Sequence, residues 1–295
     1  TLRFDRGAEN LVLKGGAKLF YGVTVNDDDW QGSAYNTRRL DAFVGARWDL
    51  GNHGSTLSLQ YTLGKSRVSD VAATTSSLVA AEAGDLIQSS LRVTYKTPSK
   101  PVREGGLWRY GFKTSADLYG LGGRTKYANV SLNAHLSRGF ASGYTLSGRT
   151  TAGVLAGIDG YGPRITDRAF LASSMPRGYA FAGIGPSDRS NGNRTGLGGL
   201  NYVTASLELD KDLIALDKST INGYFFADAG SVWGLDNTAI IGGAVDDGLH
   251  IRGSIGVGLG WKSGFGHFSI SYAKPIGDRA SDVTQPLQLG FRTIF

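Results

Sequence analysis

In Tyr127-Ala128-Asn129-Val130-Ser131-Leu132-Asn133-Ala134-His135-Leu136, apolar and polar residues alternate, and this alternation is the clearest indication of the fold. Successive side chains of an extended strand point to opposite faces, so a period of two gives one apolar face and one polar face. A strand of this kind separates an apolar environment from a wet one.

The same alternation recurs along the whole chain. We count about a dozen such segments of about 10–15 residues each, which is the pattern of outer-membrane barrels. Two segments deviate, since 220–232 is apolar on both faces and 10–25 alternates only in part. The clearest further segments lie at 40–50, 87–96, 108–117 and 202–209.

A soluble β-sandwich is the alternative that this pattern disfavours. Strands there are usually about 5–6 residues long, and Arg and Lys would not recur opposite a clean apolar face. In hydrocarbon every backbone donor and acceptor must be paired, so the sheet has to close around a wet lumen. We therefore predict an all-β chain in which residues 1–295 form one closed antiparallel transmembrane β-barrel domain.

Composition excludes several other classes of protein. The chain has 295 residues, no cysteine and a formal net charge of +6. Its four histidines lie far apart in sequence, so we expect no metal site and no cofactor. Lys and Arg are scattered without a recognisable nucleic-acid module, so no nucleic-acid partner is expected. Without a G-x-S-x-G motif or a Ser/His/Asp grouping, we do not expect an enzyme. The run Asp27-Asp28-Asp29 could hold a cation, although such runs are usually solvated.

Short and long links alternate between the predicted strands, as expected when one rim carries tight turns and the other carries surface loops. The short links are 51–54, 139–143 and 263–266, and the long ones are 26–37, 70–85, 158–201, 235–249 and 277–286. Aromatic residues near segment ends are expected in two interfacial girdles. They are Tyr21, Trp48, Tyr61, Tyr95, Trp108, Tyr119, Tyr127, Tyr144, Trp233, Trp261, Tyr272 and Phe295.

The longest link, 158–201, is predicted to be a functional loop in the lumen or outside it, because structureless loops of this length are otherwise uncommon in compact domains. Its centre, Met175 to Pro186, is rich in apolar and aromatic residues, which indicates packing. Arg177 in such surroundings needs an acidic partner, since an unpaired buried charge is costly. The following segments offer two candidates, Glu208 and Asp228.

These residues resemble a known family. Arg177-Gly178-Tyr179, followed by Gly183-Ile184-Gly185-Pro186, is similar to the [VI]-R-G-[FY] loop motif of the BamA-type superfamily of outer-membrane protein-assembly factors, although Pro176 stands where that motif has Val or Ile. The last segment, with Leu289, Gly290, Phe291 and the final Phe295, is similar to the family's C-terminal strand. Further matches follow in the family's order at 198–199, 205–208, 228–233, 256–261 and 265–266.

The resemblance implies a loop folded into the lumen, with Arg177 at its tip pairing with Asp228 and with Glu208. It also implies a barrel of sixteen strands, of which about twelve are visible. The first strands and the periplasmic POTRA domains are then expected to be absent from this chain, and a smaller barrel is the rival explanation. The implied function is assembly of outer-membrane proteins through a lateral seam between the first and last strands.

The implied partners are the lipid bilayer with lipopolysaccharide, unfolded outer-membrane clients, and periplasmic or lipoprotein accessory subunits. The implied location is the bacterial outer membrane. One alternative is a two-partner-secretion (TpsB) transporter, which residues 10–16 and 38–41 resemble more closely. A second alternative is a diffusion porin whose constriction is lined by cations. These cations would be Arg47, Arg92, Arg109, Lys113 and Arg149.

Overall fold

The computed structural model describes most of the chain. The described residues are 2–12, 15–28, 34–51, 54–101, 107–121, 125–141, 143–171, 175–190, 192–216, 218–241, 243 and 245–293. The predicted girdle residue Phe295, which also belongs to the predicted terminal strand, lies outside these ranges, as does Asp29 of the acidic run.

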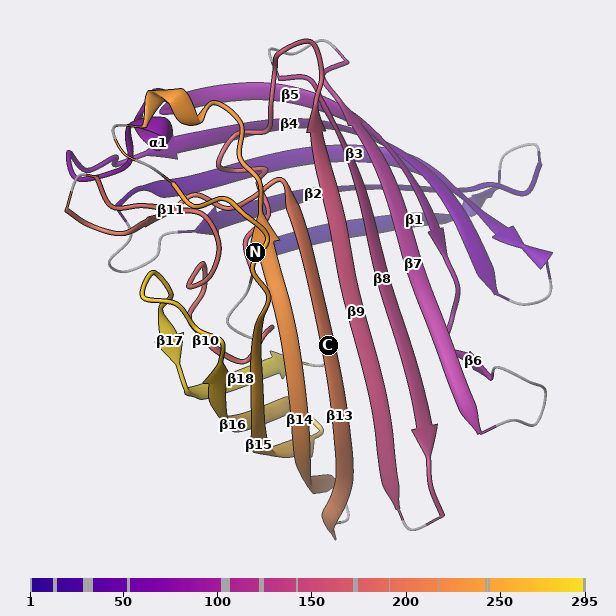
Figure 1. Cartoon of the computed structure of the whole chain (residues 1–295). Helices are drawn as coiled ribbons and strands as arrows, with labels where there is room; N and C mark the ends of the chain where they lie inside the picture. Colours follow the sequence, from indigo (N-terminus) through magenta and orange to yellow (C-terminus); the bar gives the residue numbers. More distant parts are fainter. Residues whose placement is uncertain are drawn as a thin grey trace.

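One antiparallel 14-stranded sheet dominates the structure, and its strands follow one another in chain order (Figure 1). The short β6 (Lys100–Pro101) pairs only with β7, beside the main order. The main order is β1 (Leu2–Val12), β2 (Lys18–Asp28), β3 (Asn36–Leu50), β4 (Ser55–Ser69), β5 (Gly84–Lys96), β7 (Trp108–Tyr119), β8 (Tyr127–Gly139), β9 (Tyr144–Gly157), β13 (Asn201–Leu216), β14 (Ser219–Trp233), β15 (Arg252–Ser263), β16 (Gly266–Ile276) and β18 (Leu287–Thr293).

The long loop 158–201 divides this sheet into two parts. We call the eight strands before it, β1 to β5 and β7 to β9, the first half, and the five strands after it, β13 to β16 and β18, the second half. The prediction of about a dozen long strands is therefore close to the observed number.

The strand faces follow the predicted alternation. In β8, Val130, Leu132 and Leu136 are exposed on the outer face, whereas Tyr127 on the inner face is buried. β14 shows why 220–232 is apolar on both sides. Phe225 is 67% exposed on the outer face, while its neighbour Phe226 is buried on the inner face, where the loop packs.

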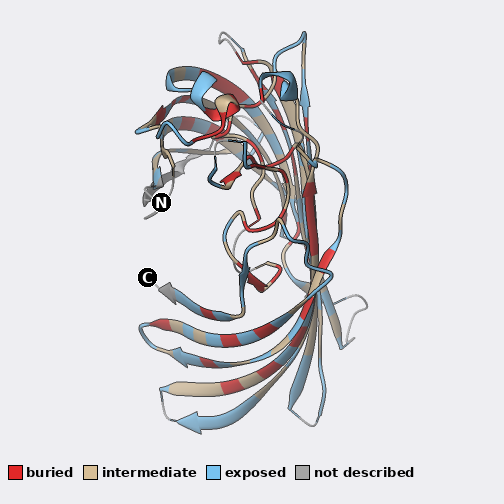
Figure 2. Ribbon diagram, turned by 60° about the vertical axis from the view of Figure 1, so that its left-hand side comes forward, coloured by how far each residue is buried: buried red, intermediate tan, exposed pale blue. Residues whose placement is uncertain are grey.

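The sheet is strongly curved, and the loop lies on its concave side (Figure 2). β1 pairs with β2, and β18 pairs with β16, but within the described residues no pairing joins β1 to β18. The predicted antiparallel barrel sheet is confirmed in strand order and strand length. Its predicted closure is not observed, since β1 and β18 each present an open edge. In hydrocarbon the backbone groups on such an edge would need a further partner.

Two aromatic residues assigned to the girdles are placed elsewhere. Tyr119 and Tyr127 are cross-strand partners on the inner face, their rings stacked at 4.2 Å, and they pack with Leu155. The girdle assignment was wrong for this pair because both residues have the parity of the polar face. Tyr21, Tyr61, Trp261 and Tyr272 of the same prediction are exposed.

The links carry small elements that pack together. A buried cluster joins the 70–85, 158–201 and 235–249 links through Leu78, Ile165, Leu197 and Ile241. No described helix is long and apolar enough to cross a membrane. The small elements are α1 (Ser77–Ala81), β10 (Gly178–Tyr179), β11 (Ser187–Asp188), β12 (Thr195–Gly196), η2 (Thr238–Ile240) and β17 (Thr284–Gln285).

Candidate functional site

The centre of the long loop forms a short strand inside the sheet's concave face. β10 pairs antiparallel with β17, so that Gly178 lies opposite Gln285 and Tyr179 opposite Thr284. Gln288 of β18 donates a hydrogen bond of 2.9 Å to the Tyr179 carbonyl. The loop tip, residues 177–179, is thereby joined by backbone pairing to the segment that leads into the last strand.

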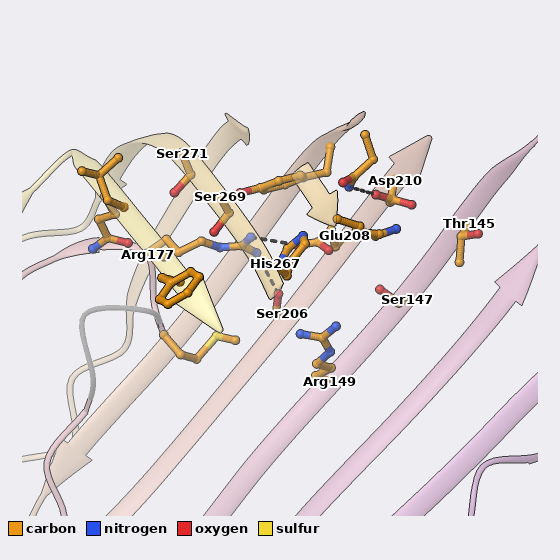
Figure 3. A pocket seen from close by; sticks show the side chains of 18 of the residues that line it. Thr145, Ser147, Arg149, Arg177, Ser206, Glu208, Asp210, His267, Ser269 and Ser271 are labelled. Atoms are coloured by element: carbon orange, nitrogen blue, oxygen red, sulfur yellow. Dashed lines mark hydrogen bonds and ion pairs between the residues drawn. The ribbon is translucent and has the colours of Figure 1, made fainter. Parts of the chain in front are cut away.

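Arg177 is held by both acidic residues that the sequence singled out. Its Nε donates to Asp228 Oδ2 at 2.7 Å and its Nη2 to Asp228 Oδ1 at 2.9 Å, which is a bidentate pair. Its Nη1 donates to Glu208 Oε2 at 2.7 Å, and Nη2 also donates to Ser206 Oγ at 3.1 Å (Figure 3). The Arg177 backbone N–H completes the set by donating to Asp228 Oδ2 at 3.0 Å.

Strand register explains how these partners meet. Ser206 and Glu208 are two residues apart in β13 and therefore share the inner face. Ser206 is the cross-strand partner of Asp228 in β14, so the three acceptors form one patch on the wall. Alternation in β13 predicts Ser206 beside Glu208, a contact that the sequence reasoning missed.

An aromatic platform supports the guanidinium. The Arg177 Cζ lies 3.5 Å from the centroid of the Phe226 ring and 5.7 Å from that of Tyr224. These rings lie against β15, where a Cβ on Gly256 or Gly258 would collide with them. The platform adds a cation–π attraction to the ion pairs. Because residues 220–232 are apolar on both faces, their pattern does not predict this role.

The ion pairs are desolvated. The side chain of Asp228 is 0% exposed, and that of Arg177 is 12% exposed. Burial by itself would lower the pKa of Arg177, but the hydrogen bonds and charges of Asp228 and Glu208 outweigh it and raise that pKa. The guanidinium is therefore charged at any physiological pH, and removing one of its partners would leave a buried charge uncompensated.

Tyr179 is buried beside the tip. It packs with Leu171, Ile184 and Val232, and its hydroxyl lies 3.2 Å from the Gly253 carbonyl oxygen and 3.3 Å from that of Ile276. Burial raises the pKa of Tyr179 to about 12. The side chain thus fixes the tip to β15 and β16.

The glycines that follow the tip allow close approach. A Cβ on Gly183 would lie 2.5 Å from the Val283 carbonyl oxygen. Gly185 has a φ of +98°, which favours glycine, and a Cβ there would collide with Val232. The carbonyl of Pro186 accepts the Leu197 N–H at 2.9 Å. These residues let the loop turn back along the wall.

The predicted residues of the terminal strand face two ways. Leu289 is 80% exposed and Phe291 59% exposed, both on the outer face. Gly290 faces inward, where a Cβ would lie 2.5 Å from Ser269 Oγ.

A polar cavity of about 620 Å³ lies between the tip and the wall strands (Figure 3). Its lining combines hydroxyls with charges of both signs, among them Ser147, Arg149, Glu208 and Ser269. Of the other predicted lumenal cations, Arg92 pairs with Asp117 and Arg109 donates to the Ser99 carbonyl. Within the described ranges, no three His, Asp or Glu side chains are grouped to hold a metal ion.

The long antiparallel strands and the loop anchored on their concave face define an outer-membrane β-barrel of the kind that carries a lumenal loop. The chain belongs to the Omp85 superfamily, whose domain model matches residues 8–295. It is a bacterial outer-membrane protein.

Similar proteins support this assignment. The chain is 27% identical over 245 residues to "Outer membrane protein assembly factor BamA" of Neorickettsia risticii, a match that covers 81% of this chain and 32% of that protein. It therefore spans about a third of the length of this relative. The crystal structure of Haemophilus ducreyi BamA lacking POTRA domains 1–3 superposes with a TM-score of 0.74 at 19% identity, covering 97% of this chain and 60% of the other. CdiB from Escherichia coli gives a TM-score of 0.53 at 12% identity, with coverages of 92% and 48%.

Proposed function

We propose that this chain is the barrel region of an outer-membrane protein-assembly factor that inserts β-barrel clients at a lateral seam between the first and last strands of its barrel, with β18 on one side of the seam. Family membership and the BamA relative support assembly as the function. The proposed partners are the bilayer with its lipopolysaccharide, unfolded clients and accessory subunits. The mechanism is non-covalent and needs no catalytic residue.

The observation that carries the proposal is the open edge of β18. This strand has seven residues, and within the described part of the chain it pairs with β16 alone. An unpaired edge offers a row of backbone donors and acceptors to an incoming strand, which can add to the sheet by β-augmentation. The exposed Leu289 and Phe291 beside it would contact the apolar face of such a client.

Site-specific photo-crosslinking tests this assignment. A photoreactive phenylalanine analogue replaces Leu289 at the edge or, as a matched control, Phe225 on the outer face of β14. Both positions are apolar and exposed to the same surroundings, but β14 is paired on both sides. A nascent client supplied to the full-length protein should crosslink to position 289 and not to position 225.

The alternative of export through the lumen gives a different pattern. A third probe at Arg149, which lines the cavity on the inner face, would then capture the passing chain. Crosslinking at 149 without crosslinking at 289 would overturn the proposal in favour of a two-partner-secretion transporter. Equal crosslinking at 289 and 225 would also overturn it.

A further inference from the structure

The long loop is also attached to the opposite wall of the lumen. Ten residues before Arg177, the side chain of Asp167 is 1% exposed and accepts hydrogen bonds from two strands of the first half. Arg39 of β3 donates through Nη1 at 2.5 Å, and Gln88 of β5 donates through Nε2 at 3.0 Å.

The wall side of this contact is itself supported. Asp41 binds the Arg39 Nε at 2.8 Å, and the guanidinium therefore bridges two carboxylates. Thr125 donates to Gln88 Oε1 at 3.4 Å, which orients the Gln88 amide nitrogen toward Asp167. A buried carboxylate with this many donors is a specific anchor, because each donor would otherwise be left unsatisfied on the lumen wall.

A second ion pair holds the same stretch of loop, residues 164–168, which we call the loop base. Arg168, whose side chain is 1% exposed, binds Glu82 in the link between β4 and β5. The carboxylate of Glu82 also accepts the Ile165 N–H at 2.5 Å. Both attachments of the loop base therefore lead to the first half of the sheet.

The loop tip is bound only to the second half in the described contacts of its side chains. Arg177 binds β13 and β14, and the Tyr179 hydroxyl reaches carbonyls of β15 and β16. The base and the tip thus connect opposite walls through a short length of chain. Their polarity is reversed, since the loop supplies the anion at the base and the cation at the tip.

We propose that Asp167 is a positioning residue that makes the loop a strut across the lumen, fixing the distance between β3 and β5 on one wall and β13 and β14 on the other, while the halves themselves adjoin along the β9–β13 ladder. The strut does not depend on the function of the seam, so a test of the strut is independent of a test of client insertion. If the strut sets the distance between the two walls, breaking the contacts of the base has the same effect as breaking the contacts of the tip. Releasing either one frees the halves to move relative to each other.

Double electron–electron resonance on the full-length protein in lipid nanodiscs tests the strut. This chain has no cysteine, so spin labels go onto introduced cysteines after any cysteine elsewhere in the protein is replaced. One label pair spans the halves, at Leu63 of β4 and Phe225 of β14, and a control pair lies within the first half, at Val44 of β3 and Leu132 of β8. All four side chains are exposed on the outer face.

The base is released by Asp167→Asn together with Glu82→Gln, and the tip by Arg177→Ala. The expected result is a roughly twofold broader distance distribution for the spanning pair in each variant, with the control pair unchanged. Asp159→Asn is the matched control, since Asp159 is an exposed carboxylate of the same loop that pairs with Lys126. It should leave both distributions as they are.

Two outcomes would overturn the strut. An unchanged spanning distance in the Asp167→Asn/Glu82→Gln protein would show that the base does not hold the halves. Broadening of both label pairs would show a general loss of structure instead of a positioning role. Client insertion, measured in the same preparations, keeps this result separate from the proposed function.

Discussion

The two anchors of the long loop solve the same physical problem with opposite charges. At the tip, Arg177 of the loop binds two carboxylates of the sheet, Asp228 and Glu208. At the base, Asp167 of the loop accepts hydrogen bonds from donors on the sheet, chiefly Arg39. Both satisfy the rule that a buried charge needs a partner and further hydrogen bonds. The tip also gains an aromatic platform, whereas the base relies on hydrogen bonds from β3 and β5.

The largest expected effect falls on the tip. Asp228→Ala removes three of the hydrogen bonds made by Arg177 and leaves a buried guanidinium with Glu208 and Ser206. We expect a loss of about 3–5 kcal/mol in the free energy of unfolding. Urea unfolding from lipid vesicles, followed by tryptophan fluorescence, measures this loss. A loss no larger than that of Glu208→Ala would show that the bidentate pair is not the main contact.

A change at the base should lower the free energy of unfolding by a smaller amount. Asp167→Asn keeps the shape of the side chain but removes its charge, while Arg39 retains Asp41. We expect a loss of about 1.5–3 kcal/mol in the same unfolding assay, because Arg39 loses one ion pair and Gln88 loses its charged acceptor. If this loss exceeds that of Asp228→Ala, the base is the dominant anchor and the comparison is reversed.

Backbone conformation in the segment that follows the tip gives the next effect. Gly185→Ala places a Cβ at a φ of +98° and against Val232. A loss of about 1–3 kcal/mol is expected from the strained conformation alone. Gly192→Ala is a suitable control, since its φ is +88° but nothing lies within 4 Å of its Cβ position. Equal losses in the two variants would mean that contact with Val232 is unimportant.

Ser206→Ala should have the smallest effect. It removes one hydrogen bond of 3.1 Å to an arginine that keeps its carboxylates. The expected loss is about 0.5–1.5 kcal/mol in the same assay. A loss matching that of Asp228→Ala would contradict the ranking of partners at the tip.

Local periodicity was enough to predict the strands, because one face of each strand meets lipid and the other does not. It was enough to place Val130 outside and Glu208 inside. Residue types alone misplaced Tyr119 and Tyr127, which were assigned to the girdles although their parity put them in the lumen. Parity is therefore the stronger signal in this fold.

The partners of the tip could be predicted from the sequence, whereas those of the base could not. Arg177 stands in a motif, and its partners follow it in nearby strands. Asp167 meets Arg39 across 128 residues of sequence, so no local pattern points from one to the other. Closure of the sheet could not be predicted from local patterns either, since it depends on which strands pair with the edges of β1 and β18.

Docking of the loop tip is tested by a double-mutant cycle with Arg177→Ala, Asp228→Ala and both changes together. Unfolding free energies of the full-length protein in lipid vesicles give the coupling. A docked loop predicts strong non-additivity, with a coupling of more than about 1 kcal/mol, because either change alone leaves a buried charge without its partner. Additive effects, within about 0.5 kcal/mol, would show that the loop tip is not docked against β13 and β14 and would contradict the account.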